Sequence, residues 1–343
     1  MATLYDLMRW VRDFVGDPRH QPRFMADDFG WHQLCTAMDT IQDTESAVSA
    51  YVDHTFPDDT GERYLRTYGI LQGLFLQQDA LIELINAIRP VKNIRPRDLL
   101  TNALIDVRGM RNKSVGHPTK LGRKAPFSTH AIVQHSMRKE GFELMSYPHQ
   151  SGQIFQGVPV LDLIEKQRAE TFRILSEVVE DLRAQEETHR AQFRGIKLMS
   201  VFDQTSYAFE KIFEELRRDS ALAMGKWAVG HLRTSLDNFE KLLKQRGLEL
   251  DSYDSIKYRY DEIEHPLNEL STFLHGEESE ILSDKSAVVF ADALRSHFID
   301  LRHMAGEIDD EYGSEPEPVI QPVQQGGFQV IVQRIGEPEK AGD

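Results

Sequence analysis

The chain has 343 residues, of which 40% are hydrophobic and 28% charged, and its formal net charge at pH 7 is −15. This length predicts about two domains, and the acidic balance argues against a protein that wraps nucleic acid by general charge attraction. No apolar run is long enough for a membrane-spanning helix, and Met1–Trp10 lacks the apolar stretch of a secretory signal. Cys35 is the only cysteine, which excludes intrachain disulfides and Cys-rich zinc sites and favours a cytoplasmic protein.

Helical periodicity dominates the first part of the chain. Residues 1–30 are expected to form an N-terminal helical segment, and residues 31–54 and 62–88 two longer helices. One apolar stripe runs along the second of these and consists of Tyr64, Tyr68, Leu71, Phe75, Ile82 and Ile85. Gln78 falls on this stripe, where an apolar residue would be expected. Pro96 suits the first turn of a further helix, which should continue through Leu100 to Met110.

The pattern changes between residues 128 and 156, where short β-like runs and turn residues predict two or three antiparallel strands. Helical periodicity then returns near Leu161 and persists to about Ile308. Breaks near Gly195, Gly247 and Gly276 divide this stretch into four or five expected amphipathic helices. A strand is also predicted at residues 328–332, within a segment rich in Pro, Glu and Gln.

These patterns predict a mostly α fold with a small antiparallel β insertion. We expect a helical domain over residues 31–190, with the β-hairpin insertion at about 128–157. A second helical domain should follow over residues 191–311, and a Pro/Glu-rich tail over residues 312–343.

The charge is unevenly distributed along this acidic chain. From Arg89 to Lys124, ten basic residues oppose two acidic ones, which gives a net charge of +8. A basic patch on an acidic body can steer one phosphate chain to one site. The same surface could instead meet the acidic remainder of the protein, and the sequence leaves both interpretations open.

Within this basic segment lies the sequence Arg111-Asn112-Lys113-Ser114-Val115-Gly116-His117. An Arg followed after four to six residues by a His is a weak pattern by itself, and three other pairs match it: Arg123/His130, Arg183/His189 and Arg259/His265. The surroundings distinguish the first pair. Asp106 to Lys113, followed by His117, resembles the active-site motif of the HEPN superfamily, in which Arg is followed by a polar residue and then by His.

The motif is most similar to the nuclease modules of ribonuclease L and of the unfolded-protein-response kinase–endoribonuclease. Close resemblance covers about a dozen residues, and a looser HEPN-like helical context covers residues 30–190. Pro118 stands where those eukaryotic relatives have a tyrosine, so any substrate contact of that tyrosine is missing here.

The resemblance implies a homodimeric, metal-independent endoribonuclease that uses the ribose 2′-hydroxyl as nucleophile and leaves a 2′,3′-cyclic phosphate. His117 would supply acid–base chemistry near neutrality, and Arg111 would stabilise the negative charge that builds on the phosphate. Asn112 would orient either group or hold the backbone. RNA contacts are expected from the nearby basic residues Arg108, Lys113, Lys120, Arg123 and Lys124.

Two residues of the preceding helix are candidates for a supporting role. Gln78 could reach a buried site, although a satisfied core amide is the more common outcome for such a residue. Asp79 could pair with Arg111 or remain solvated. No metal and no cofactor are expected, because His130 and His135 are wrongly spaced for a metal pair on one strand face.

The spacing of the motif bears on its geometry. On one continuous helix, Arg111 and His117 would lie about 120° apart and about 9 Å along the axis. Gly116 predicts a helix end, and Pro118 disfavours helical backbone at His117, so His117 should lie past the helix and turn back. The competing interpretation is a capping and salt-bridge cluster of Arg111, Asn112 and His117 at a helix C-terminus.

The leading hypothesis is therefore a HEPN-like endoribonuclease that acts on RNA. By family analogy it would serve as a bacterial toxin or an antiviral defence effector, with an antitoxin or another protein as partner. The first rival is a non-catalytic helical RNA-binding scaffold. A second rival, a protein–protein adaptor, depends on the acidic body and the long helices.

Overall fold

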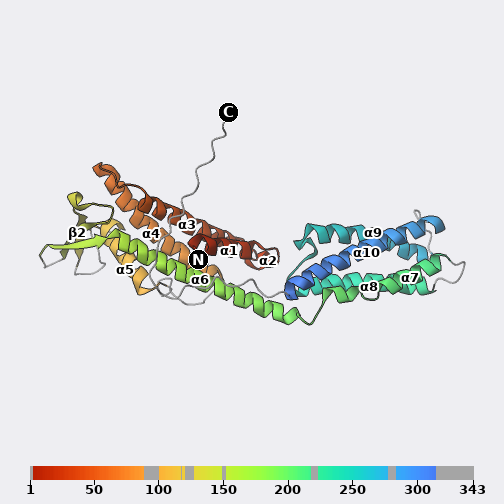
Figure 1. Cartoon of the computed structure of the whole chain (residues 1–343). Coiled ribbons are helices and arrows are strands. Elements are labelled where there is room, and N and C mark those ends of the chain that lie inside the picture. Colours follow the sequence, from red (N-terminus) through yellow and green to blue (C-terminus); the bar gives the residue numbers. More distant parts are fainter. Residues whose placement is uncertain are drawn as a thin grey trace, which may run out of the picture.

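The computed structural model describes residues 3–88, 100–116, 118–119, 127–148, 152–217, 223–276 and 283–313. Helices dominate and one small antiparallel sheet interrupts them, so the predicted fold class is confirmed. Two helical bundles lie end to end, and α6 (Val160–Phe193) runs from the sheet toward the second bundle (Figure 1). Within the described ranges, no helix has the length and apolar character needed to cross a membrane.

The first bundle contains the helices expected before residue 112. They are α1 (Leu4–Gly16), α2 (Gln21–Phe24), α3 (Asp28–Asp53), α4 (Thr60–Ile88) and α5 (Asn102–Arg111). The prediction that the last of these includes Leu100 is wrong. Thr101 caps α5 by accepting a hydrogen bond from the Leu104 N–H at 3.4 Å, and Leu100 precedes the helix as a buried core residue. Pro96 lies outside the described residues.

Two hydrophobic clusters form the core of this bundle. One cluster joins α1, α3, α4, α5 and α6, so the N-terminal helix packs with the helices that follow it. The other lies at the sheet end, where Leu71 of α4 and Val107 of α5 pack with Leu144 of the sheet. Gln78 lies among these core residues with 0% of its surface exposed. The predicted apolar stripe of α4 therefore faces the core at Leu71, Ile82 and Ile85, whereas Tyr68 is exposed, and Tyr64 and Phe75 are half-buried.

The sheet has three strands, β1 (Ser128–Ile132), β2 (Gly141–Pro148) and β3 (Ile154–Pro159), in the order β1-β2-β3. Both pairings are antiparallel, and His130 lies opposite Ser146. Gly141 is required at its position, because a Cβ there would lie 2.1 Å from the Val158 carbonyl oxygen. The prediction of two or three antiparallel strands is confirmed.

The second bundle has its own core. It contains α7 (Thr205–Leu216), α8 (Ala223–Gln245), α9 (Asp254–Leu274) and α10 (Asp284–Gly313), preceded by a short 3₁₀ turn, η4 (Leu198–Phe202). Gly247 and Gly276 follow α8 and α9 with φ of +76°, a backbone conformation that favours glycine, so two of the predicted breaks are confirmed with their cause. The strand predicted at residues 328–332 lies outside the described residues.

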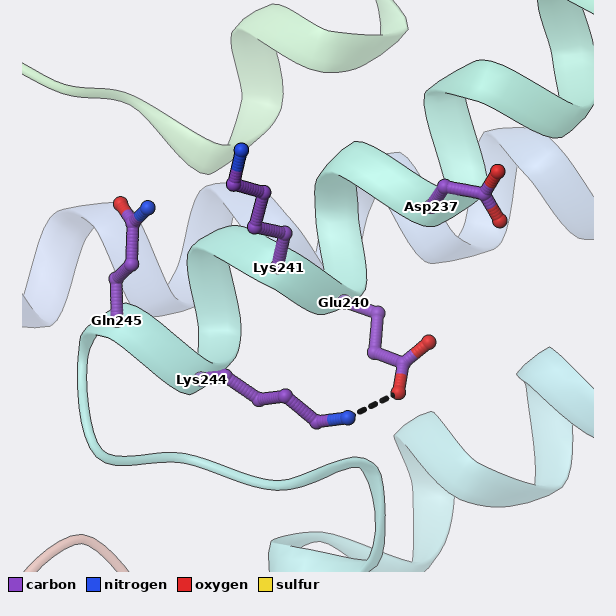
Figure 2. Close-up of a pocket in the computed structure, with 5 residues that line it drawn as sticks. All are labelled: Asp237, Glu240, Lys241, Lys244 and Gln245. Carbon is purple, nitrogen blue, oxygen red and sulfur yellow. Dashed lines mark hydrogen bonds and ion pairs between the residues drawn. The ribbon is translucent and has the colours of Figure 1, made fainter.

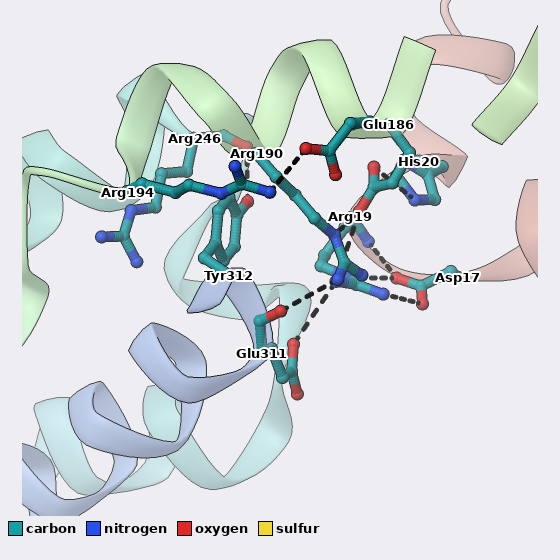
Figure 3. Close-up of polar contacts among 10 residues, drawn as sticks. Asp17, Arg19, His20, Glu186, Arg190, Arg194, Arg246, Glu311 and Tyr312 are labelled. Atoms are coloured by element: carbon teal, nitrogen blue, oxygen red, sulfur yellow. Dashed lines mark hydrogen bonds and ion pairs between the residues drawn. The ribbon is translucent and has the colours of Figure 1, made fainter. Parts of the chain in front are cut away.

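Charged side chains connect the two bundles where α6 meets the end of α10 (Figure 3). Arg19 donates hydrogen bonds to Asp17 and lies 3.5 Å from a carboxylate oxygen of Glu311. Behind this cluster, the buried Arg246 guanidinium donates to Asp309 at 2.8 Å. The Arg19–Glu311 ion pair, together with a hydrogen bond that Arg190 of α6 donates to the Glu311 carbonyl oxygen at 3.0 Å, therefore links the bundles in addition to the chain itself.

Candidate functional site

The resembled motif lies where α5 ends. Its regular helix stops at Arg111, and Asn112–Gly116 form one π-helical turn, η2. Single π-turns are rare in proteins as a whole, but many of them lie at functional sites, because the wider turn redirects side chains. The helical path thus ends at Gly116, as predicted. Of the other candidate residues, His117, Lys120, Arg123 and Lys124 lie outside the described residues.

Three neighbours hold the guanidinium of Arg111 in place. Its Nε and Nη2 donate to Oε1 of Gln72 at 3.1 and 2.7 Å, and its Nη1 donates to Oδ1 of Asn112 at 3.1 Å. The ring of Phe75 lies beneath it, with 4.0 Å between the guanidinium carbon and the ring centroid. Asn112 therefore orients Arg111, which is one of the two roles expected for it.

Gly116 makes this arrangement sterically possible. A Cβ at this residue would lie 2.5 Å from Nη1 of Arg111 and 3.3 Å from Oδ1 of Asn112. The guanidinium is thus folded back over the π-turn, against the residue that immediately precedes His117.

Arg108, and not Arg111, forms an ion pair with Asp79. Its Nη2 donates to Oδ1 of Asp79 at 2.7 Å, and its guanidinium carbon lies 4.0 Å from the centroid of the same Phe75 ring. The proposed pairing of Asp79 with Arg111 is wrong. Asp79 lies two helical turns beyond Gln72 on α4, level with Arg108, while Arg111 lies level with Gln72.

The electrostatics of this cluster favour an anion. Burial and the neighbouring Arg108 charge lower the pKa of Arg111, and Asp79 opposes them. Two guanidinium groups thus share one aromatic ring and one nearby carboxylate. Nη1 of Arg108 is buried and has no hydrogen-bond partner among the described residues, and the same holds for Oγ of Ser114.

Strand β1 returns to the motif from the other side. The His130 N–H donates to the Pro118 carbonyl oxygen at 2.6 Å, one residue past His117. Its ring lies between two hydroxyls, Ser146 Oγ at 2.8 Å from Nδ1 and Ser128 Oγ at 2.9 Å from Nε2. Burial, and then the charge of Lys113, lower the pKa of His130. The sequence pattern paired His130 only with Arg123 and did not connect it to the motif, because its contacts come from strand pairing and not from spacing.

Gln78 supports the site from within the bundle. Its Nε2 donates to the Leu104 carbonyl oxygen of α5 at 3.1 Å and to Oε1 of Gln167 at 2.9 Å. It is therefore a core amide that fixes α5 against α4 and α6. Its described contacts do not include the arginines.

Two other features were considered as sites. Within the described ranges, no group of three or more His, Cys, Asp or Glu side chains is placed to hold a metal ion. A shallow surface depression on α8 is lined by Asp237, Glu240, Lys241, Lys244 and Gln245 (Figure 2). Its Lys244 is already paired with Glu240 at 2.6 Å, and the mixed charges select no ligand.

Comparisons with known proteins add no family to this description. No protein-family model matches the chain. Searches of curated proteins and of solved structures likewise returned no match.

Proposed function

We propose that this protein is a metal-independent endoribonuclease of HEPN type. The observation that carries the proposal is the guanidinium of Arg111, held by Gln72, Asn112 and Phe75 and folded back against Gly116. This geometry brings a fixed cation beside the segment that contains His117. Arg108 and Lys113 add positive charge to the same end of α5, which suits a polyanionic substrate.

In this mechanism each residue type has a distinct task. The 2′-hydroxyl oxygen attacks the adjacent phosphorus, the P–O5′ bond breaks, and a 2′,3′-cyclic phosphate and a 5′-hydroxyl result. Arg111 stabilises the charge that builds on the phosphate oxygens, and because it is already oriented, little reorganisation is needed during the reaction. His117 transfers a proton near neutral pH.

The family resemblance extends the proposal beyond the site. It suggests a homodimer, a cytoplasmic RNA substrate and a role as a toxin or antiviral defence effector with a protein partner such as an antitoxin. These statements depend on the motif of residues 106–117 and not on the geometry.

A non-catalytic RNA-binding scaffold is the second candidate, and one observation favours it. The described hydrogen bonds of Arg111 all go to protein groups, Gln72 and Asn112, as they would in a purely structural cluster. A scaffold would keep RNA affinity and the salt dependence of phosphate contacts but would show no turnover.

The deciding experiment incubates the purified protein with total RNA in EDTA and maps the cut ends. We expect cleavage that survives chelation and leaves 2′,3′-cyclic phosphates. His117→Ala and Arg111→Ala should each lower the rate by about 10²–10⁴-fold. Arg295→Ala, which alters an exposed arginine of α10 in the second bundle, is the matched control and should retain full activity.

The outcomes separate the two candidates. RNA binding without cleavage, unchanged in His117→Ala, would support the scaffold. Cleavage that chelation abolishes would overturn the metal-independent mechanism. A double variant of Arg111 and His117 should be scarcely slower than either single variant, because groups acting on one transition state are not additive.

A further inference from the structure

If the protein is the ribonuclease proposed above, each cleavage must move two protons. The 2′-hydroxyl loses its proton as the O2′–P bond forms, and O5′ gains one as the P–O5′ bond breaks. His117 can perform one of these transfers in a given step. Among the described residues around Arg111, His130 has the side chain whose ordinary pKa, 6.5, suits the other.

The position of His130 on β1 places it close to the described part of the motif. Side chains alternate along a strand, so His130 and Ile132 lie on the same face of β1. Ile132 packs in the same hydrophobic cluster as Met110 of α5 and Val115 of the π-turn, so this face covers the motif. The backbone bond from His130 to Pro118 joins β1 to the residue after His117.

A chain of hydrogen bonds runs through the imidazole. Ser146 is 9% exposed and contacts Nδ1, and the half-buried Ser128 contacts Nε2. Neutral imidazole has one donor and one acceptor nitrogen, so a hydroxyl on each side makes a continuous path for a proton. The path leads from the buried Ser146 to Ser128 at the beginning of β1.

The surroundings keep the imidazole neutral at rest. Burial disfavours the imidazolium cation and lowers the pKa of His130. Among the described residues, the positive charge of Lys113 in the π-turn lowers this pKa further. The facing residue on β2 is the uncharged Ser146. A neutral imidazole can accept a proton, and the resulting cation beside Lys113 would readily release it again.

We propose that His130, acting through Ser128, is the general base of this site. Ser128 Oγ accepts the 2′-hydroxyl proton while its own proton passes to His130 Nε2, the O2′–P bond forms, and the P–O5′ bond breaks. Protonated His117 then donates a proton to O5′. Exchange with water restores both histidines after the cyclic phosphate has left, and Ser146 keeps the ring in the orientation that accepts the proton at Nε2.

A leaving group that needs no protonation distinguishes the two histidines. The substrate is a short RNA with sulfur in place of the bridging O5′ at the cleavage site, compared with the ordinary RNA under single-turnover conditions in EDTA. We expect His130→Gln to cleave both substrates about 10²–10⁴-fold more slowly than the wild type. His117→Ala should be slow on ordinary RNA and largely restored on the sulfur substrate.

Two further readouts exclude a merely structural role. An RNA with a 2′-deoxy residue at the cleavage site should bind His130→Gln as well as it binds the wild type. The acidic limb of the kcat/KM profile should shift in Ser146→Ala and disappear in His130→Gln. His135→Gln changes an exposed histidine of the same β region and is the matched control, with full activity expected.

Each outcome has a distinct meaning. If the wild type does not cleave RNA in EDTA, the ribonuclease proposal fails and the base assignment fails with it. If the wild type cleaves and His130→Gln cleaves equally well, only the role of His130 is overturned. Rescue of His130→Gln by the sulfur substrate would overturn its assignment as the base. Should His130→Gln melt well below the wild type, Ser128→Ala decides, because it leaves the His130–Ser146 pair intact.

Discussion

At the scale of single residues, the site depends on short-range steric fit. Arg111 is fixed by three neighbours, and the absence of a side chain at Gly116 lets its guanidinium lie over the π-turn. Gly109, about two turns earlier, has open space where a Cβ would be. The two glycines therefore differ in what an added methyl group would meet, although they are only seven positions apart.

Gly116→Ala should displace the guanidinium of Arg111, since the new Cβ would lie 2.5 Å from its Nη1. We expect RNA cleavage to fall at least tenfold, in line with losing a positioned phosphate donor, while the free energy of unfolding changes by about 1 kcal/mol or less. Single-turnover cleavage and urea denaturation test this. Gly109→Ala is the control and should keep full activity with a stability gain of up to about 1 kcal/mol. Equal activity of both variants would contradict the steric argument.

At the scale of elements, α5 is held by a polar network inside an apolar bundle. Gln78 of α4 bonds the α5 backbone and Gln167 of α6, and Gln167 Nε2 donates to Oε1 of Gln77 at 2.9 Å. All three glutamines are 0% exposed. Buried amides are costly unless they are paired, so the network favours one alignment of α4, α5 and α6 over others.

Truncating this network should lower the free energy of unfolding. Gln78→Ala leaves the Leu104 carbonyl and the Gln167 amide without their donor and opens a cavity, so we expect a loss of about 2–4 kcal/mol of unfolding free energy. Replacing Gln78 and Gln167 together by Leu should cost less than the sum of the two single Leu variants, because both partners become apolar. Urea denaturation measures each value, and Gln245→Ala at the exposed end of α8 is the control. Additive costs would show that the two amides act independently.

At the scale of the whole molecule, a buried charged pair fixes the point where the chain that leaves α6 enters the second bundle. Asp309 of α10 accepts hydrogen bonds from the backbone N–H groups of Leu198 and Met199, both at 2.9 Å, and from Arg246 at 2.8 Å. The side chains of Arg246 and Asp309 are 1% and 4% exposed. This pair ties η4, which follows the end of α6, to the ends of α8 and α10.

Removing one member of this pair should destabilise the protein strongly. Asp309→Ala leaves the Arg246 charge buried without its partner, for which we expect a cost of about 3–5 kcal/mol. The adjacent Asp310 is exposed, and Asp310→Ala should be within about 0.5 kcal/mol of the wild type. Urea denaturation and limited proteolysis near residue 195 are the measurements. Comparable stability of the two variants would mean that the buried pair contributes little.

Acid should weaken the same junction through His20. Its ring stacks on Phe14 at 4.1 Å, and its Nε2 lies 3.2 Å from Oε2 of Glu186. Burial lowers the pKa of His20 below its ordinary 6.5, although Glu186 and Asp17 oppose the shift and Arg19 and His189 add to it. Below pH 6.5 the unfolded chain binds this proton more readily than the folded chain does. The stabilising contribution of neutral His20 is therefore complete above pH 6.5 and is lost as the pH falls through the folded-state pKa.

The melting temperature should therefore fall as the pH drops below about 6.5, the ordinary pKa of histidine. In His20→Gln the fall should be smaller, because one group that gains a proton on unfolding has been removed. His32→Gln, at an exposed position of α3, is the control and should follow the wild type. Parallel profiles for wild type and His20→Gln would show that this histidine does not couple folding to pH.

The sequence alone predicted much of the secondary structure, because these features depend on local chemistry. Apolar spacing along residues 62–88 predicted α4, and short β-like runs between turn residues predicted the small sheet. Gly247 and Gly276 marked helix ends because their backbone adopts positive φ. Gly116 predicted where the helical path through α5 ends, but the π-helical turn of residues 112–116 was not predicted. These features depend on residues that are near one another in the chain.

Tertiary structure alone decided which side chains meet. The partner of Asp79 is Arg108 and not Arg111, because the alignment of α5 along α4 sets the level at which two side chains face each other. His130 reaches the motif only because β1 pairs with β2 and its inner face covers the π-turn. The single polar position on the stripe of α4, Gln78, became part of a network that needs Gln167, 89 residues away. Contacts at such separations depend on how whole elements pack, and periodicity within one element carries no information about that packing.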